Sequence, residues 1–427
     1  MFNPSALKII PKEKTEIILP RYQDYCFANL PPTILKLFGC HHSNPTLPQD
    51  AFPYPQKYQR LILILLDAFG FQNFKNQQSQ FRFLTNKAIV SPLTSVFPST
   101  TAAALSTLHT GVLPKKHGLI EWHLYLPEVG QIITTLPFSF SSSCQDELLK
   151  QGFSPKLLLN QKTIFQALAQ QKGVRSFAFV KRDYARSAYS KISQKGAKTI
   201  AYQGLTDLFV NLKNVFQHQA KKSSPAYFYA YIDSLDSLGH QYGPQSEAYQ
   251  EEVKRIAWSL KNIFLSNLSP KEKEKTLLII TADHGQIDID PQKNFSLNRF
   301  LKLKKNLKTN PMGEKILATG GPRDLFLHLE KGKIPATLFY LQKKLGNTAF
   351  VYSLKTAEKM GFFGPGKTSK RFRQRAGDIL ILPRGKTTFW LEKKEKRKKP
   401  PKLGHHGGLS SQEMLIPLIA ANLSHLS

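Results

Sequence analysis

The feature that most constrains the fold of this chain is the run LILILL at residues 61–66, which contains no polar residue and leads into Asp67. A strand with one face in water alternates apolar and polar residues, so an unbroken run predicts a strand that is buried on both faces. Further strand-like and helical segments alternate along the chain, with strands at 88–100, 174–180, 226–233 and 276–283 and helices at 101–109, 163–171, 205–219 and 247–268. This alternation predicts an α/β fold with helices on both faces of the sheet.

Composition divides the chain into four predicted segments. They are an N-terminal extension (1–57), a catalytic α/β core (58–285), a basic insertion subdomain (286–402) and a C-terminal return to the core (403–427). The insertion contains 28 Lys and Arg against 9 Asp and Glu, an excess of 19 in a chain of net charge +31. Its predicted elements are strands at 323–329, 347–354 and 378–383 and a helix at 337–345. We expect its last basic run, 393–402, to be a mobile loop.

The charge and the cysteine content limit the partners and the compartment. A strongly basic surface favours contact with phosphates, nucleic acid or an anionic membrane. Three cysteines are too few, and an odd number, for a disulfide framework, which fits a reducing compartment. The first 20 residues interrupt their apolar residues with prolines and charges, unlike a secretory signal. We therefore expect a soluble cytoplasmic protein.

Acidic and imidazole side chains follow several of the predicted strands. Asp67 ends the first strand, and functional groups of α/β proteins collect at the carboxyl ends of strands. Asp236 and His240 are four residues apart, which places them on one face of a helical turn, and a carboxylate with an imidazole suits Zn²⁺ or a similar ion. Asp283 and His284 are adjacent at the end of another strand. Each motif alone also fits a turn or a helix cap.

The sequence GHHGG at 404–408 adds His405 and His406 among glycines. The motifs together supply six candidate ligands, namely Asp67, Asp236, His240, Asp283, His284 and His406. Six ligands are enough for two metal sites. Two ions about 3.5–4 Å apart can clamp the attacking and leaving oxygens of a displacement at phosphorus.

A cluster of hydroxyls, Ser99, Thr100 and Thr101, stands at the start of the predicted helix 101–109. Ser and Thr are the ordinary N-cap residues of helices, which is the simplest explanation of the cluster. A hydroxyl at this place also lies next to free N–H groups that bind phosphate. When it is coordinated to a metal, such a hydroxyl can ionise near neutral pH and act as a nucleophile.

This set of motifs, in this order, resembles the alkaline phosphatase superfamily, and most closely its type I phosphodiesterase/nucleotide pyrophosphatase branch. The resemblance rests on LLDAFG (65–70), FPSTTAAALSTLHTGVLPKKHG (97–118), DSLGHQYGP (236–244), TADHG (281–285) and GHHGGLSSQEMLIPL (404–418). It implies an alkaline-phosphatase-like mixed sheet and two divalent metal ions, with zinc expected and manganese as the alternative. One ion would be held by Asp67, Asp283 and His284, and the other by Asp236, His240 and His406. His405 is the competing choice for the last ligand.

The resemblance also implies a threonine nucleophile that forms a phospho-threonine intermediate. The nucleophile of the family lies nine residues before the Thr of a Thr-Gly pair, here Thr110-Gly111, which selects Thr101, with Thr100 as the alternative. The chain departs from the family where FPS replaces FPN and where Glu121, Trp122 and His123 occupy the stretch that usually holds a substrate-binding Asn. Four basic residues are candidates for contact with the anion, namely Lys115, Lys116, Lys181 and Arg182.

The sequence therefore predicts a metal-dependent phosphoester hydrolase that acts on a small phosphorylated substrate, a nucleotide being one candidate. Diesters, monoesters and pyrophosphates all remain open as substrates. A phosphomonoesterase of the same superfamily is one alternative. Another is a nucleic-acid-binding protein on a degenerate hydrolase scaffold, since clustered basic residues neutralise a phosphate backbone. Residues 393–402 could also attach the protein to anionic lipid.

Overall fold

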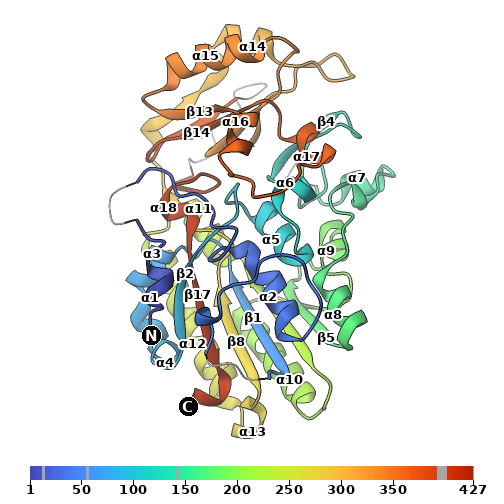
Figure 1. Cartoon of the computed structure of the whole chain (residues 1–427), viewed down its shortest axis with the longest axis vertical. Helices are drawn as coiled ribbons and strands as arrows, with labels where there is room; N and C mark the ends of the chain where they lie inside the picture. Colours follow the sequence, from blue (N-terminus) through green and yellow to red (C-terminus); the bar gives the residue numbers. More distant parts are fainter. Residues whose placement is uncertain (12–14, 54–56, 141–143, 392–401, 427) are drawn as a thin grey trace.

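The computed structural model describes residues 1–11, 15–53, 57–140, 144–391 and 402–426. A seven-stranded sheet forms its centre, in the order β2-β17-β8-β1-β7-β5-β6 (Figure 1). The strands are β1 (Arg60–Leu66), β2 (Ile89–Thr94), β5 (Arg175–Lys181), β6 (Ala197–Tyr202), β7 (Ala226–Ile232), β8 (Thr276–Thr281) and β17 (Leu415–Asn422). Every residue of β1 is buried, which confirms the prediction from the unbroken apolar run.

The central sheet is mixed. β1 runs parallel to β7 and β8, and β5 runs parallel to β6 and β7. β17 is antiparallel to both of its neighbours, β2 and β8. The predicted α/β class with a mixed sheet is therefore confirmed. β6 and β17 were not predicted as strands.

Helices cover both faces of this sheet. The helices that matter for the site and its surroundings are α5 (Thr101–Thr110), α8 (Ile164–Lys172), α10 (Leu205–Ala220), α11 (Ser234–Tyr242) and α12 (Glu247–Ser259). Tyr227 of β7 stacks on Phe165 of α8, with ring centroids 5.7 Å apart, whereas the next residue, Phe228, packs on Phe216 of α10 at 5.4 Å. Successive side chains of a strand point to opposite faces, so α8 and α10 lie on opposite sides of the sheet.

The basic segment forms a second, antiparallel sheet in the order β11-β12-β14-β13, at the top of the view in Figure 1. Its strands are β11 (Thr319–Gly321), β12 (Asp324–Leu327), β13 (Ala349–Ser353) and β14 (Ile379–Pro383), and α14 (Leu301–Asn306) and α15 (Ile334–Leu345) pack beside it. Its side chains form a separate buried cluster that includes Leu303, Leu341 and Ile381. The predicted strands and helix of this segment are confirmed, whereas its division from the core at 286 and 402 stays a prediction.

The basic run 393–402 lies outside the described residues, apart from Lys402. Among the described residues, the helices are all too short or too polar to span a bilayer.

Before β1, α2 (Leu30–Leu37) packs on α5, and Tyr22 donates a hydrogen bond to the carbonyl of Phe362 at 2.9 Å. The N-terminal segment thus contacts both α5 and the segment that contains the second sheet.

Candidate active site

The predicted acids lie together because three neighbouring parallel strands end at one edge of the central sheet. Asp67 follows β1, Asp283 lies just beyond β8, and α11, which carries Asp236, follows β7. The turns after β1 and β8 touch each other. A Cβ atom on Gly285 would lie 2.0 Å from the carbonyl oxygen of Gln412 and 2.9 Å from the Cα of Gly70, so only glycine fits between them.

Asp67, Asp283 and His284 form the first of two groups whose ligand atoms lie within 4.8 Å of one another. The Nε2 atom of His284 is 3.4 Å from Asp67 Oδ1 and 3.5 Å from Asp283 Oδ2. Ligands that lie about 2.0–2.1 Å from a tetrahedral zinc ion are separated by about 3.3–3.4 Å. The spacing of this group therefore fits a zinc site.

Asp236, His240 and His406 form the second group. Asp236 Oδ1 lies 3.4 Å from Nε2 of His240 and 3.5 Å from Nε2 of His406, again close to the edge of a zinc tetrahedron. The amide of Gln286 donates to the same Asp236 oxygen at 3.1 Å and holds the carboxylate in place. Among the described residues, His405 belongs to neither group, although it lines the same cavity.

The three histidines of the two groups present the same ring nitrogen to the site. The Nδ1 atoms of His240, His284 and His406 lie 2.7, 3.0 and 3.1 Å from the carbonyl oxygens of Gly404, Gly285 and Ser99. A carbonyl accepts only from a protonated nitrogen, so each Nε2 keeps its lone pair. Histidines that ligate metals are typically held by such a bond on the other nitrogen.

Electrostatics favour a cation between these groups. Burial raises the pKa of Asp67 well above its ordinary value, and the carboxylates of Asp283 and Asp236 raise it further. Burial also raises the pKa of Asp283. Among the described residues, neither Asp67 Oδ1 nor Asp283 Oδ2 has a hydrogen-bond partner, although both are buried. A divalent cation would satisfy both oxygens, so the residues present fit the metal that the sequence predicted.

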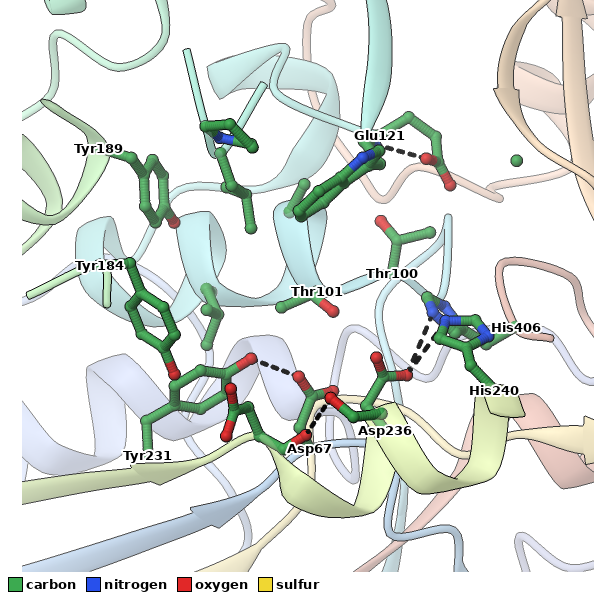
Figure 2. Close-up of a pocket in the computed structure, with 18 of the residues that line it drawn as sticks. Asp67, Thr100, Thr101, Glu121, Tyr184, Tyr189, Tyr231, Asp236, His240 and His406 are labelled. Atoms are coloured by element: carbon green, nitrogen blue, oxygen red, sulfur yellow. Dashed lines mark hydrogen bonds and ion pairs between the residues drawn. The ribbon is translucent and has the colours of Figure 1, made fainter. Parts of the chain in front are cut away.

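The two groups are adjacent, and Thr101 lies beside them. The rings of His284 and His406 stack with centroids 3.9 Å apart, so the first group abuts the second. Thr101 is the first residue of α5, and its Oγ1 is 3.1 Å from Nε2 of His284. Figure 2 shows Thr101 facing the carboxylates of Asp67 and Asp236.

The other two hydroxyls of the predicted cluster are used in the fold. Thr100 caps α5, because its Oγ1 accepts from the N–H of Ala103 at 3.4 Å and donates to the carbonyl of Ile120 at 2.9 Å. Ser99 donates to the carbonyl of Gly408 at 2.7 Å. The structure therefore places the hydroxyl of Thr101 next to the two candidate ligand groups, whereas the hydroxyls of Thr100 and Ser99 bond to the backbone.

A cavity of about 640 Å³ opens onto this site. Figure 2 shows tyrosines on one side of Thr101, namely Tyr184, Tyr189 and Tyr231, and Glu121, His240 and His406 on the other. The hydroxyl of Tyr231 donates to Asp67 Oδ2. Sequence reasoning missed these tyrosines. Only Tyr231 had a signal in the sequence, because the alternation in AYFYAYI of β7 places Tyr227, Tyr229 and Tyr231 on one face of the strand.

None of the four predicted anion contacts lines the cavity, within the part of the chain that the structure describes. Lys181 instead forms an ion pair with Asp233, with Nζ 3.4 Å from Oδ2. Lys115 is buried, and the carboxylate of Glu358 acts on its charge. The described cation that does line the cavity is Lys402, at the end of the basic segment.

Comparison with known proteins gives a family and several relatives for this chain. A family model described as type I phosphodiesterase/nucleotide pyrophosphatase matches residues 61–409. Venom phosphodiesterase CdcPDE of Crotalus durissus collilineatus is 26% identical over 235 residues, which is 54% of this chain and 26% of that protein. Human ectonucleotide pyrophosphatase/phosphodiesterase family member 1 is 24% identical over 216 residues, 50% of this chain and 21% of the relative. The matched stretch is thus only 26% and 21% of the length of these two relatives.

Solved structures share the fold. Murine ectonucleotide pyrophosphatase/phosphodiesterase 5 superposes with a TM-score of 0.59 at 16% identity, covering 84% of this chain and 87% of that chain. Phosphonoacetate hydrolase from Sinorhizobium meliloti gives a TM-score of 0.59 at 17% identity, with 87% and 91% covered. At these identities the likeness supports the architecture alone.

Proposed function

Because this chain belongs to the type I phosphodiesterase/nucleotide pyrophosphatase family, we propose that it is a metal-dependent phosphoester hydrolase with Thr101 as its nucleophile. The observation that carries the proposal is the position of the Thr101 hydroxyl. It lies 3.1 Å from His284 and beside two groups of residues whose ligand atoms are close enough together to hold a metal ion.

Two divalent cations fit the two groups. Asp67, Asp283 and His284 would hold one, and Asp236, His240 and His406 would hold the other. Neutral imidazoles and carboxylates are the ligand set that zinc prefers, which makes zinc the first choice and manganese the second. When bound, such ions lower the pKa of a coordinated hydroxyl and neutralise charge on phosphoryl oxygens.

Thr101 would attack the phosphorus in line with the leaving oxygen. A bond forms between its Oγ1 and phosphorus while the bond to the leaving group breaks, which gives a phospho-threonine. Water then attacks phosphorus from the opposite side, the bond to Thr101 breaks and the hydroxyl is restored. The first turn of α5 begins at Thr101, and its N–H groups would favour the negative charge of a phosphoryl group bound there.

The substrate we propose is a small phosphodiester, a nucleotide derivative being the leading candidate. The names of the relatives support this, and ectonucleotide pyrophosphatase/phosphodiesterase 5 of mouse has been solved in complex with AMP as an inactive variant. The cavity of about 640 Å³ has the size of a small-molecule pocket. The rings of Tyr184, Tyr189 and Tyr231 offer aromatic surface to the organic part of the substrate.

The test is hydrolysis of a substrate panel by the zinc-loaded protein, comprising an aryl diester, an aryl monoester, a dinucleotide and a nucleoside triphosphate. We expect Thr101→Ala to lower kcat by about 10³-fold or more while metal content is unchanged, because the attacking oxygen is lost. Thr100→Ser is the matched control. It keeps the cap hydroxyl and should retain activity.

Two outcomes would contradict the proposal. Full activity of Thr101→Ala would move the nucleophile to a neighbouring hydroxyl. The absence of turnover of every ester by the metal-loaded protein, together with salt-sensitive binding to unrelated DNA, would favour the nucleic-acid-binding alternative.

A further inference from the structure

Two helices beside the second sheet, α14 and α15, form one end of the molecule. They pack against each other, because the amide of Asn306 donates to the hydroxyl of Thr337 at 2.9 Å and the ring centroids of Phe300 and Tyr340 are 6.1 Å apart. In Figure 1 they lie at the upper end of the long axis, remote from the central sheet and from both chain ends. Their outer face is therefore an end surface of the molecule.

Each of the two helices has a buried side and an exposed side. Leu303 of α14 and Leu341 of α15 belong to the buried cluster of the second sheet. Leu301 and Phe339 point away from this cluster and are 69% and 70% exposed. Among the described residues, only Met1 is a more exposed large apolar side chain. Because the helices that carry them are in contact, Leu301 and Phe339 belong to the same end surface.

This end surface is also basic. Neither helix contains an Asp or a Glu, and together they contain five lysines, namely Lys302, Lys304, Lys305, Lys343 and Lys344. All of them except Lys304 are exposed. Glu330, the acidic residue shortly before α15, is engaged with Lys315, since its Oε1 atom lies 3.6 Å from Nζ. The surface therefore attracts an anionic partner.

The exposed apolar and basic side chains lie on the same side of each helix. Lys305 follows Leu301 by four residues, and Lys343 follows Phe339 by four residues, and residues four apart are neighbours on a helix surface. Helices that lie on an anionic membrane have this composition. Their apolar side chains enter the boundary between headgroups and acyl chains, and their lysines reach the headgroups.

Other anionic partners fit this surface less well. Proteins that bind single-stranded nucleic acid stack the bases on aromatic side chains, and Leu301 is aliphatic. Lysine is depleted from protein–protein interfaces, whereas here a lysine accompanies each protruding apolar side chain. A bilayer accepts an aliphatic and an aromatic side chain alike. The end of the molecule can also meet a flat surface without interference from the central sheet (Figure 1).

We propose that the outer face of α14 and α15 docks on the surface of an anionic membrane. Leu301 and Phe339 enter the headgroup region, and the four exposed lysines contact the lipid phosphates. This inference goes beyond the proposed function and does not depend on the chemistry of the active site. No residue of α14 or α15 lines the cavity, so docking leaves the cavity to its substrate. The docking residues are also separate from the basic run 393–402.

The first test is cosedimentation of the full chain with vesicles of phosphatidylcholine mixed with phosphatidylserine, and with vesicles of phosphatidylcholine alone. We expect binding to the mixed vesicles only. The double variant Leu301→Ser and Phe339→Ser should bind them about tenfold or more weakly, because two apolar side chains no longer leave water. Trp258→Ser is the matched control, since Trp258 is 60% exposed on α12 beside the central sheet. It should bind as the wild type does.

The second test removes the charge of the same face. Replacement of the four exposed lysines should weaken binding to the mixed vesicles by about 30-fold or more, because each lysine near an anionic surface contributes to binding. The substitutions are Lys302→Gln, Lys305→Gln, Lys343→Gln and Lys344→Gln. The matched control removes four exposed lysines from the other part of the molecule and should weaken binding by less than about threefold. Its substitutions are Lys75→Gln, Lys191→Gln, Lys221→Gln and Lys271→Gln.

The third test reports insertion directly. Phe339→Trp should show tryptophan emission that shifts to shorter wavelengths when the mixed vesicles are added, beyond any change in the wild type with its three native tryptophans. Thermal unfolding of every variant without vesicles checks the fold. All the replaced side chains are exposed, so we expect midpoints close to that of the wild type.

Three results would overturn the inference. One is a wild type that does not bind the mixed vesicles. Another is an equal loss of binding in the two lysine variants with no loss in the serine double variant, which would indicate the general attraction of a basic protein. The third is binding of duplex DNA, but not of vesicles, through the four lysines of α14 and α15. Each of these results would leave the proposed hydrolase function standing if the protein still hydrolyses its ester substrates.

Discussion

At the scale of single residues, neighbouring side chains and backbone groups orient the proposed ligands. Asp67 is oriented by Tyr231, and the next residue, Ala68, has the unusual φ of 59° for a residue with a Cβ. The N–H of Ala68 donates to Asp283 Oδ1 at 3.2 Å, and its carbonyl accepts from Tyr249 at 2.9 Å. These bonds compensate for an uncommon backbone conformation next to a ligand.

We predict that Tyr231→Phe weakens metal binding at the Asp67 group by about 10–100-fold, because the hydroxyl that orients the carboxylate is lost. Zinc titration with a competing chelator measures the effect. Tyr227→Phe is the control on the same strand, since its buried hydroxyl has no hydrogen-bond partner among the described residues. Equal zinc affinity of the two variants would show that Tyr231 does not support Asp67.

We also predict that His406→Ala lowers the metal content by one ion per chain, whereas His405→Ala leaves it unchanged. His406 lies 3.5 Å from Asp236, and His405 belongs to neither ligand group of the described residues. Elemental analysis of the purified variants checks this. The reverse result would assign the last ligand to His405, the alternative that the sequence left open.

At the scale of elements, the site is built where turns approach one another closely. The turns after β1 and β8 touch through Gly70 and Gly285, and α11 approaches β16 (Gly404–His405) through Gly239. A Cβ atom on Gly404 would lie 2.3 Å from the carbonyl oxygen of Gly239. Both approaches bring segments that carry proposed ligands into contact, so the two proposed metal groups depend on them.

We predict that Gly285→Ala lowers the free energy of unfolding by about 2–4 kcal/mol, because its Cβ would collide with the backbone of Gln412, which cannot move aside easily. Urea unfolding in the presence of chelator gives the value without a metal contribution. Gly204→Ala, where a Cβ meets no atom within 4 Å, should cost less than about 1 kcal/mol as an N-cap change. A similar loss in both variants would contradict this account of the turn.

The residue pattern of each strand explains whether the sequence predicted it. β1, β7 and β8 are continuous apolar runs and were predicted. β6 was missed because its residues are largely exposed at the sheet edge, so AKTIAY has no apolar pattern. β17 was missed because it contains Pro417, yet this residue lies opposite Pro92 of β2 and beyond the last pair of β17 with β8. Because Pro417 lies outside the pairs of β17 with β8, the backbone N–H that proline lacks costs the sheet little stability.

At the scale of the whole molecule, charge and site are connected by the basic segment. The excess of 19 basic residues at 286–402 belongs to the part of the chain that supplies Gly320, Gly321, Trp390 and Lys402 to the cavity. A positive field around a cavity raises the rate at which anions enter it.

We predict that kcat/KM for an anionic diester falls by about tenfold between low and high salt, while kcat changes little, because salt screens the approach rather than the reaction inside the cavity. Steady-state kinetics in sodium chloride measures both constants. An uncharged solute at the same osmolality as the sodium chloride is the control for solvent effects. Rates that are independent of ionic strength would contradict steering by the basic segment.

The sequence by itself determined the α/β class, the family and the chemical types of the six candidate ligands. Each of these rests on local information, since an apolar run, a strand-end carboxylate or a short motif can be recognised from consecutive residues alone. Only the tertiary structure shows that the Thr101 hydroxyl lies 3.1 Å from His284, and that His406, rather than His405, lies within 4.8 Å of Asp236 and His240. It also joined Tyr231 to Asp67. These choices depend on contacts between segments far apart in the chain, which only the packed fold brings within bonding distance.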